Sequence, residues 1–321
     1  MAEKPAVLVT RKLPEAVEAR LARDYAPRFN PDDRVLSADE LVEGAEGAAA
    51  ILPCHSEHFS AEVIGRLPES VTAICNFSVG VDHVDLAAAK ARGIVVTNTP
   101  DVLSDATAEI AILLMLGAAR RASEGDRLVR SGGWTLWSPA FMVGSQVTGK
   151  RLGIVGMGRV GQVVARRARG FDMEVHYFNR RRLPAESEAG ATFHDSLESL
   201  LSVSQVFSLH CPAGPETADL FNAETLALLP EGAILVNSAR GALVDEDALI
   251  AALRSGTLAA AGLDVFKNEP DIHPGFAALD NVFLLPHVGS ATRETRDAMG
   301  FRALDNLDAI MAGREPGDRV A

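Results

Sequence analysis

The chain has 321 residues, 47% of them hydrophobic, and a formal net charge of −12. That length suggests about two domains, and the apolar content is ample for a buried core in each. The acidic charge argues against nucleic acid or an anionic membrane surface as the main partner, and no apolar run reaches the roughly 18 residues of a membrane span. We find no signal-peptide core either and expect a cytoplasmic protein.

The first part of the chain has the pattern of an α/β domain. Helical patterns, such as those at 14–25 and 61–67, separate short apolar runs that are typical of buried parallel strands. These runs lie at 6–10, 49–52, 71–75 and 94–97. The first domain is therefore predicted to end near residue 99. A long buried helix is expected at 104–121, with Ser104 as its N-cap, and we expect it to bridge two domains.

Residues 152–182 read as a strand, a glycine-rich turn, a helix and a second strand. Gly156, Gly158 and Gly161 have the spacing that a dinucleotide site needs for a tight turn, close approach to a pyrophosphate, and close packing of helix on strand. The glycines alone are a weak signal, since glycines also cluster in ordinary turns. Their context predicts a dinucleotide site at the helix N-terminus.

The end of the second strand discriminates between cofactors. An acidic residue about 20 residues after the glycines binds the ribose 2′-hydroxyl in NAD enzymes, whereas this strand ends in Asn179, Arg180, Arg181 and Arg182. Guanidinium groups suit a 2′-phosphate, which a carboxylate would repel. NADP(H) is therefore favoured over NAD(H). The alternative is a solvated basic turn.

Further strands at 206–209, 233–236, 260–264 and 282–285 alternate with helices near 223–229 and 246–255, which predicts a doubly wound parallel sheet. The tail, 291–312, has helical apolar spacing. If it returns to the first domain, a Rossmann cofactor domain (100–289) is inserted into a flavodoxin-like substrate domain (1–99 and 290–321). The two chain crossings would then form a hinge.

Three polar residues follow consecutive predicted strands: Arg240, Glu269 and His287. Reducing a 2-keto acid requires a hydride, a proton for the developing alkoxide, and a cation for the carboxylate and ketone. Arg240 suits the carboxylate, His287 can give the proton, and Glu269, if paired with it, favours the imidazolium. Each also has a plainer interpretation, as a surface ion pair, a turn residue and a loop histidine respectively. Their shared position favours a site.

The chain resembles the D-isomer-specific 2-hydroxyacid dehydrogenases over nearly its whole length. The resemblance is carried by NFSVGVDHVD (76–85), ATAEIAILLMLGAARR, the GMGRVG loop, HCP (210–212), VNSARG (236–241), GLDVFKNEP (262–270) and LPHVGSAT (285–292). Within the family, GGWTLWSP (132–139) and the basic strand end most resemble glyoxylate and hydroxypyruvate reductases. An NADP-dependent reductase of a small 2-keto acid is implied, with Arg240, Glu269 and His287 as its catalytic residues.

The resemblance also implies roles for residues outside the trio. The backbone N–H groups of Val79 and Gly80, after Ser78, would bind the substrate carboxylate, although the same residues can form a plain turn. Asp264 would accept a hydrogen bond from the nicotinamide carboxamide, and Arg159 and Val160 would lie at the pyrophosphate. The other residues implied at the cofactor are Thr107, His210, Cys211, Pro212, Ser238, Ala239 and Gly289.

The two tryptophans, Trp134 and Trp137, stand in a segment with Gly, Ser and Pro. The family implies a homodimer arm through which Trp137 reaches the other subunit's substrate pocket. The alternative is ordinary packing under a loop.

Two features limit the prediction. The family usually presents an apolar side chain after the second strand of the substrate domain, whereas this chain has Pro53, Cys54 and His55, which leaves the choice of 2-keto acid open. The same fold also serves as a nucleotide-sensing corepressor scaffold, but the long disordered extensions of a scaffold are missing.

The remaining cysteines, Cys75 and Cys211, are well separated from Cys54, so no disulfide framework or metal site is expected and all three should be buried thiols.

Overall fold

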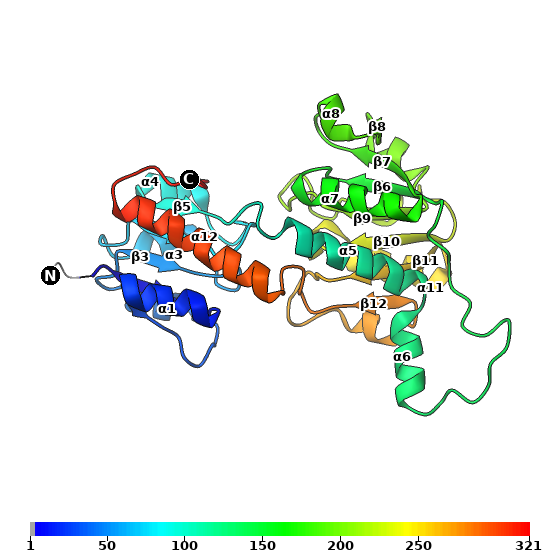
Figure 1. The fold of residues 1–321 in the computed structure, drawn as a ribbon, viewed down its shortest axis with the longest axis horizontal. Coiled ribbons are helices and arrows are strands. Elements are labelled where there is room, and N and C mark those ends of the chain that lie inside the picture. Colours follow the sequence, from blue (N-terminus) through cyan, green and yellow to red (C-terminus); the bar gives the residue numbers. More distant parts are fainter. Residues whose placement is uncertain (1–3) are drawn as a thin grey trace. The chain divides into compact units, whose positions relative to one another are not determined.

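The computed structural model describes residues 4–321, which form two compact units. Unit 1 runs to Leu103 and resumes over Ser290–Ala321, and unit 2 is Ser104–Gly289. The first boundary follows Leu103 rather than residue 99. Each unit is an open parallel sheet with helices on both faces (Figure 1), so the predicted fold class, two doubly wound α/β domains, is confirmed.

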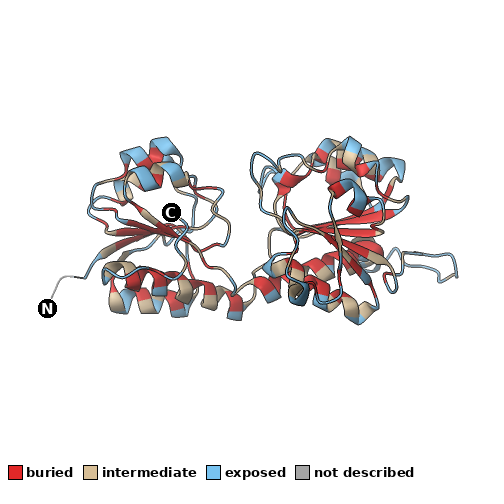
Figure 2. Cartoon of the chain, turned by 90° about the horizontal axis from the view of Figure 1, so that it is seen from above, coloured by how far each residue is buried: buried red, intermediate tan, exposed pale blue. Residues whose placement is uncertain are grey.

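Unit 1 has five parallel strands in the order β2-β1-β3-β4-β5, which is the flavodoxin-like order. The strands are β1 (Ala6–Val9), β2 (Ala26–Arg28), β3 (Ala50–Leu52), β4 (Ala73–Cys75) and β5 (Val95–Thr97). The helices are α1 (Glu15–Asp24), α2 (Ala38–Gly44), α3 (Ala61–Arg66), α4 (Leu86–Ala91) and α12 (Arg293–Met311). The sheet is buried between these helices (Figure 2) because its strands are apolar on both faces.

The strand period divides the core of unit 1 between the two faces of its sheet. Val7 and Val9 face α1 and α12, whereas Leu8 faces the layer of α2, α3 and α4. The C-terminal helix α12 approaches α1 closely at Gly300, where a Cβ atom would overlap the side chain of Val17. The tail therefore returns to complete the unit that the N-terminal half begins.

Unit 2 has seven parallel strands in the order β12-β11-β10-β9-β6-β7-β8. They are β6 (Arg151–Val155), β7 (Glu174–Phe178), β8 (Thr192–His194), β9 (Val206–Leu209), β10 (Ala233–Asn237), β11 (Leu258–Leu263) and β12 (Val282–Leu284). The helices are α5 (Ser104–Ala119), α6 (Ala122–Arg130), α7 (Arg159–Ala168), α8 (Ala185–Glu188), α9 (Leu197–Leu201), α10 (Ala223–Leu226) and α11 (Glu246–Ser255), with 3₁₀ turns η1 (Arg169–Phe171), η2 (Gly241–Leu243) and η3 (Pro274–Ala278). The strand order reverses between β6 and β9, which is where a doubly wound sheet binds its ligand.

The predicted long helix needs correction. The long helix was expected to continue to Arg121, but α5 ends at Ala119, because Arg121 adopts a left-handed φ of 55° and its guanidinium pairs with Glu124 at 2.7 Å as α6 begins. Ser104 is the first residue of α5 rather than its cap, and the whole helix belongs to unit 2. The short edge strands β2 and β8 have mixed composition and gave no strand pattern.

The three cysteines are free thiols, of which Cys75 is buried, whereas Cys54 and Cys211 are partly exposed. Among residues 4–321, no helix is long and apolar enough to cross a membrane.

Candidate active site

The glycine-rich turn follows β6 at the point where the strand order reverses. Gly156 has a φ of 95°, and a Cβ atom there would lie 2.5 Å from the backbone nitrogen of Cys211, at the end of β9. A Cβ at Gly161 would overlap the carbonyl oxygen of Gly156, whereas one at Gly158 would meet no atom within 4 Å. Packing therefore requires two of the glycines, and the third keeps an open face of the kind that a pyrophosphate needs.

Residues around this turn hold it in place. The amide oxygen of Asn179, directly after β7, accepts a hydrogen bond from Met157 N–H at 2.7 Å. Arg159 and Val160 open α7 directly after Gly158. His210 lies after β9 with its Nε2 2.8 Å from Ser208 Oγ, and loss of hydration lowers the pKa of its ring to about 4. His210 is therefore neutral near neutral pH. Pro212, two residues further along the chain, is exposed.

The arginines after β7 differ in their surroundings. Arg182 is bound by Glu188, with 2.7 and 3.1 Å between guanidinium nitrogens and carboxylate oxygens, and it lies over the ring of Phe193. Arg181 is exposed, and Arg180 makes only a 3.4 Å contact with Glu216 in which both side chains are at least 80% exposed. Two arginines, rather than three, are therefore available to an anion here.

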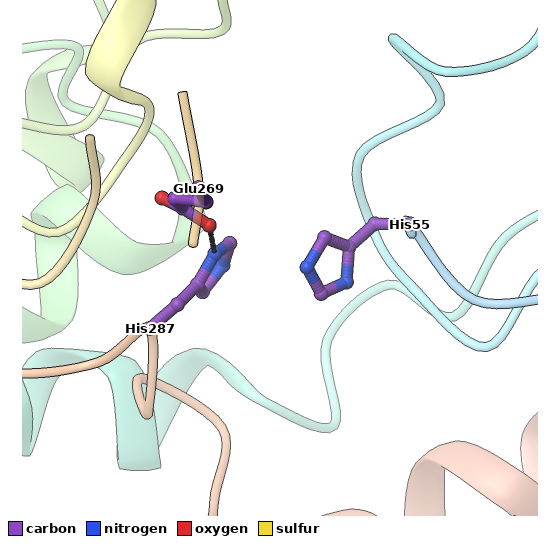
Figure 3. Close-up of side chains that lie close together, drawn as sticks. All are labelled: His55, Glu269 and His287. Carbon is purple, nitrogen blue, oxygen red and sulfur yellow. Dashed lines mark hydrogen bonds and ion pairs between the residues drawn. The ribbon is translucent and has the colours of Figure 1, made fainter. Parts of the chain in front are cut away.

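Glu269 and His287 form a hydrogen-bonded pair (Figure 3). His287 Nδ1 lies 2.5 Å from Glu269 Oε2, and Glu269 Oε1 accepts a hydrogen bond from Phe266 N–H at 2.8 Å. With Glu269 as an ionised carboxylate, which only accepts, Nδ1 is the donor of this hydrogen bond. His287 follows β12 with a left-handed φ of 53°, and its backbone N–H donates to Asp264 O at 2.8 Å. Backbone and side chain together fix the ring.

Arg240 stands on the loop that follows β10. Asn237 closes this loop, because its amide nitrogen donates to Arg240 O at 2.9 Å and its amide oxygen accepts from Ala239 N–H at 3.0 Å. At Gly241 a Cβ would overlap the backbone of Phe266, so this loop lies directly against the loop that carries Glu269. The structure thus places the loops of the predicted trio side by side, at the carboxyl ends of β10, β11 and β12.

A second group of predicted residues meets at the end of β11. Asp264 is buried, its Oδ1 accepts from Val288 N–H at 2.8 Å, and burial raises the pKa of its carboxyl. A Cβ at Gly289 would touch both Asp264 and Thr107. The buried hydroxyl of Ser238 has no hydrogen-bond partner among the described residues. An unsatisfied buried hydroxyl and the open face of Gly158 fit a polar dinucleotide on this edge.

Sequence reasoning missed two residues that fix this edge. Asn237 closes the Arg240 loop, and Glu246, a buried residue in the first turn of α11, accepts from Lys267 N–H at 3.0 Å. Asn237 stands in the VNSARG motif, and asparagine is typical of such turns. Glu246 looks like any acidic residue at a helix N-terminus, so its pattern carries no signal.

In unit 1, Ser78, Val79 and Gly80 form a turn after β4. Ser78 Oγ donates to Gly80 O at 2.6 Å, and the side-chain nitrogen of Asn98 donates to Val79 O at 2.8 Å. Within the described chain the N–H groups of Val79 and Gly80 donate to no group. The turn therefore presents two neighbouring donors, which is the arrangement of an anion-binding nest.

Trp134 and Trp137 lie in the loop after α6, which runs out from the body of unit 2 (Figure 1). Their side chains are 55% and 72% exposed, and Leu136 and Val143 beside them are also exposed. The alternative interpretation, in which the two tryptophans pack under a loop of their own chain, is therefore wrong.

Comparison with known proteins agrees with these features. The model of the D-isomer specific 2-hydroxyacid dehydrogenase NAD binding domain matches residues 112–289. The chain is 48% identical to a glycerate dehydrogenase of Hyphomicrobium methylovorum, over 97% of this chain and 98% of the relative. It is 43% identical to a glyoxylate reductase of Thermococcus onnurineus, over 98% and 95%. An NADPH-dependent glyoxylate/hydroxypyruvate reductase of Sinorhizobium meliloti, solved with NADP and malonate, superposes with a TM-score of 0.86 at 33% identity, over 99% and 97%.

Proposed function

The chain belongs to the D-isomer specific 2-hydroxyacid dehydrogenase family, and we propose that it reduces glyoxylate or hydroxypyruvate with NADPH. The product is the 2-hydroxy acid, in the D configuration where C2 is chiral. The observation that carries this proposal is the Glu269–His287 pair, at the same sheet edge as the glycine turn. Relatives named glycerate dehydrogenase and glyoxylate reductase support the substrate class.

Bound NADPH supplies the hydride. His287 gives a proton from Nε2 to the carbonyl oxygen of the substrate as negative charge develops there, while Glu269 holds the ring through Nδ1. Arg240 binds the substrate carboxylate with its planar fork and polarises the ketone. We also assign the N–H groups of Val79 and Gly80 to the substrate carboxylate, as the family resemblance implies. Cofactor binding is assigned to unit 2.

We take the cofactor residues from the family resemblance. The amides around Gly158, Arg159 and Val160, at the start of α7, would hold the pyrophosphate. Asp264 would accept from the nicotinamide carboxamide, and the Ser238 hydroxyl, which has no partner here, would gain one from the bound cofactor. Thr107, His210, Cys211, Pro212, Ala239 and Gly289 line the remainder.

The preference for NADPH rests on the end of β7. Asn179 replaces the acid that would repel a 2′-phosphate, and Arg180 and Arg181 are exposed beside it. Release of Arg180 from Glu216 costs little, because both groups are solvated.

We also propose that the chain forms a homodimer through the loop after α6. Its exposed Trp134, Leu136 and Trp137 form an apolar surface of the kind that marks protein interfaces. Trp137→Ala should raise the KM for hydroxypyruvate or lower the sedimentation coefficient. If both stay at the wild-type value, Trp137 has no role at a subunit interface.

The proposed activity is tested by measuring kcat/KM for a series of 2-keto acids with NADPH and with NADH. We expect the largest value for hydroxypyruvate or glyoxylate with NADPH. A larger value for a bulky 2-keto acid contradicts the substrate, a larger value with NADH contradicts the cofactor, and binding of NADPH without turnover of any 2-keto acid favours a nucleotide-sensing scaffold.

A further inference from the structure

Arg296, in the first turn of α12, has a cationic side chain without a carboxylate beside it. No hydrogen bond or ion pair of its guanidinium is found within residues 4–321. The side chain is partly buried, and loss of hydration lowers the pKa of the guanidinium. An arginine in such a place is costly to the fold unless an anion binds it.

Arg302, on the same helix, shows how this chain neutralises a structural arginine. Its guanidinium makes two hydrogen bonds to Asp318, of 2.8 and 2.7 Å. Arg296 has no equivalent of Asp318. A cation in the first turn also opposes the positive end of the helix dipole, so the position of Arg296 is unfavourable on helix electrostatics too.

The neighbours of Arg296 do not supply negative charge. Its guanidinium carbon lies 6.0 Å from the centre of the Phe77 ring, the outer limit of a cation–π contact. The Cys54 thiol is the ionisable neighbour that affects the pKa of Arg296. Burial raises the pKa of that thiol to about 12. Cys54 is therefore uncharged near neutral pH, and no described residue of unit 1 balances the positive charge of Arg296.

Phe77 and Cys54 stand on the two loops that follow β4 and β3. The loops are joined by a hydrogen bond of 2.8 Å from Phe77 N–H to Pro53 O, and Phe77 directly precedes the turn at Ser78. Arg296 thus contacts residues at the carboxyl edge of the unit 1 sheet, where parallel sheets bind ligands. The donors of Val79 and Gly80 lie on the same loop as Phe77.

We propose that Arg296 is an anion-binding residue of unit 1 and takes the carboxylate of a small organic acid. The identity of that acid as a 2-keto acid rests on the proposed function. The cation of Arg296 and the N–H groups of the Ser78–Gly80 turn together offer one anion both charge and hydrogen bonds.

The test compares Arg296→Met with Arg293→Met. Arg293 lies in the same turn of α12 but is exposed, so its removal makes the same change in net charge without touching the two loops. We expect Arg296→Met to raise the KM for hydroxypyruvate about tenfold to a hundredfold, the range for a hydrogen bond to a charged group, with kcat nearly unchanged. Arg293→Met should keep the wild-type KM.

Thermal unfolding separates binding from a structural role. In buffer that contains NAD⁺ and NADP⁺, oxalate should raise the Tm of the wild type and of Arg293→Met. It should not raise the Tm of Arg296→Met. Without oxalate, Arg296→Met should unfold no lower than the wild type, because an unbalanced, partly buried charge is removed. Arg296→Lys, which keeps the charge, should recover part of the oxalate shift.

A lowered Tm with an unchanged KM and an unchanged oxalate shift means that Arg296 only packs on Phe77, and the inference is then wrong. An oxalate shift that is absent from the wild type overturns it as well. If the wild type reduces no 2-keto acid but its oxalate shift is lost in Arg296→Met, the proposed function fails and the anion site stands.

Discussion

The glycine turn of unit 2 and the Ser78–Gly80 turn of unit 1 have the same proposed task, since each follows a parallel strand and offers backbone N–H groups to an anion. They are held in different ways. The unit 2 turn is fixed by steric necessity, because a side chain at Gly156 or Gly161 would overlap the backbone. The unit 1 turn is fixed by side-chain hydrogen bonds from Ser78 and Asn98.

This difference explains why a sequence pattern predicts the anion site at one turn and not at the other. Steric necessity leaves glycine as the residue of choice at fixed spacing, so the pattern points to the ligand. A hydrogen-bonded turn can be built from several residue types, so Ser-Val-Gly is compatible with any loop. The charge near the two turns also differs, with Arg180 and Arg181 exposed in unit 2 and Arg296 partly buried in unit 1.

The largest effect is expected at the chemical centre of unit 2. His287→Ala should lower kcat about 10² to 10⁴-fold, the range for loss of a general acid, while NADPH binds as in the wild type by fluorescence titration. His273→Ala is the control, because His273 accepts from Gly275 N–H in η3 and belongs to no predicted site. A kcat for His287→Ala close to that of the wild type would refute the proton-donor role.

The steric account of the glycine turn is tested by two alanine substitutions. Gly161→Ala should destabilise the fold by about 3 kcal/mol or more, because its Cβ overlaps the carbonyl of Gly156. Gly158→Ala should melt near the wild type and weaken NADPH binding about tenfold or more, because its Cβ enters open space where the pyrophosphate is proposed. Equal losses of Tm in both variants would remove the distinction.

The basic segment is tested by the double substitution Asn179→Asp with Arg180→Ala. The ratio of kcat/KM for NADPH to that for NADH should fall about tenfold to a hundredfold, because a carboxylate replaces a favourable charge at the 2′-phosphate. Arg182→Ala should leave the ratio unchanged and lower the Tm, since Arg182 is bound to Glu188. An unchanged ratio of the two kcat/KM values in the double variant would contradict the assignment of NADP(H).

The smallest effect is expected at the unit 1 turn. Ser78→Ala removes one hydrogen bond that holds Gly80 O, worth about 1 kcal/mol, and should raise the KM for hydroxypyruvate about fivefold. Asn98→Ala removes the corresponding bond to Val79 O and should act similarly. If neither substitution changes KM, the turn does not bind the substrate.

Much of the fold could be predicted from the sequence, because buried parallel strands and the glycine fingerprint have strong periodic signals. The end of α5 and the strands β2 and β8 could not, since a left-handed arginine and three-residue edge strands leave no period to detect. The places of Arg240, Glu269 and His287 followed from the strand ends, whereas Glu246 acts through a contact between distant segments that only the folded chain reveals.

The central claim is that hydride from NADPH reaches C2 of a small 2-keto acid while His287 gives the proton. The most direct measurement incubates the protein with hydroxypyruvate and NADPH deuterated at both C4 positions, then analyses the product by mass and by chiral chromatography. The account predicts D-glycerate with one deuterium at C2. L-glycerate, product without deuterium, or no product would contradict it.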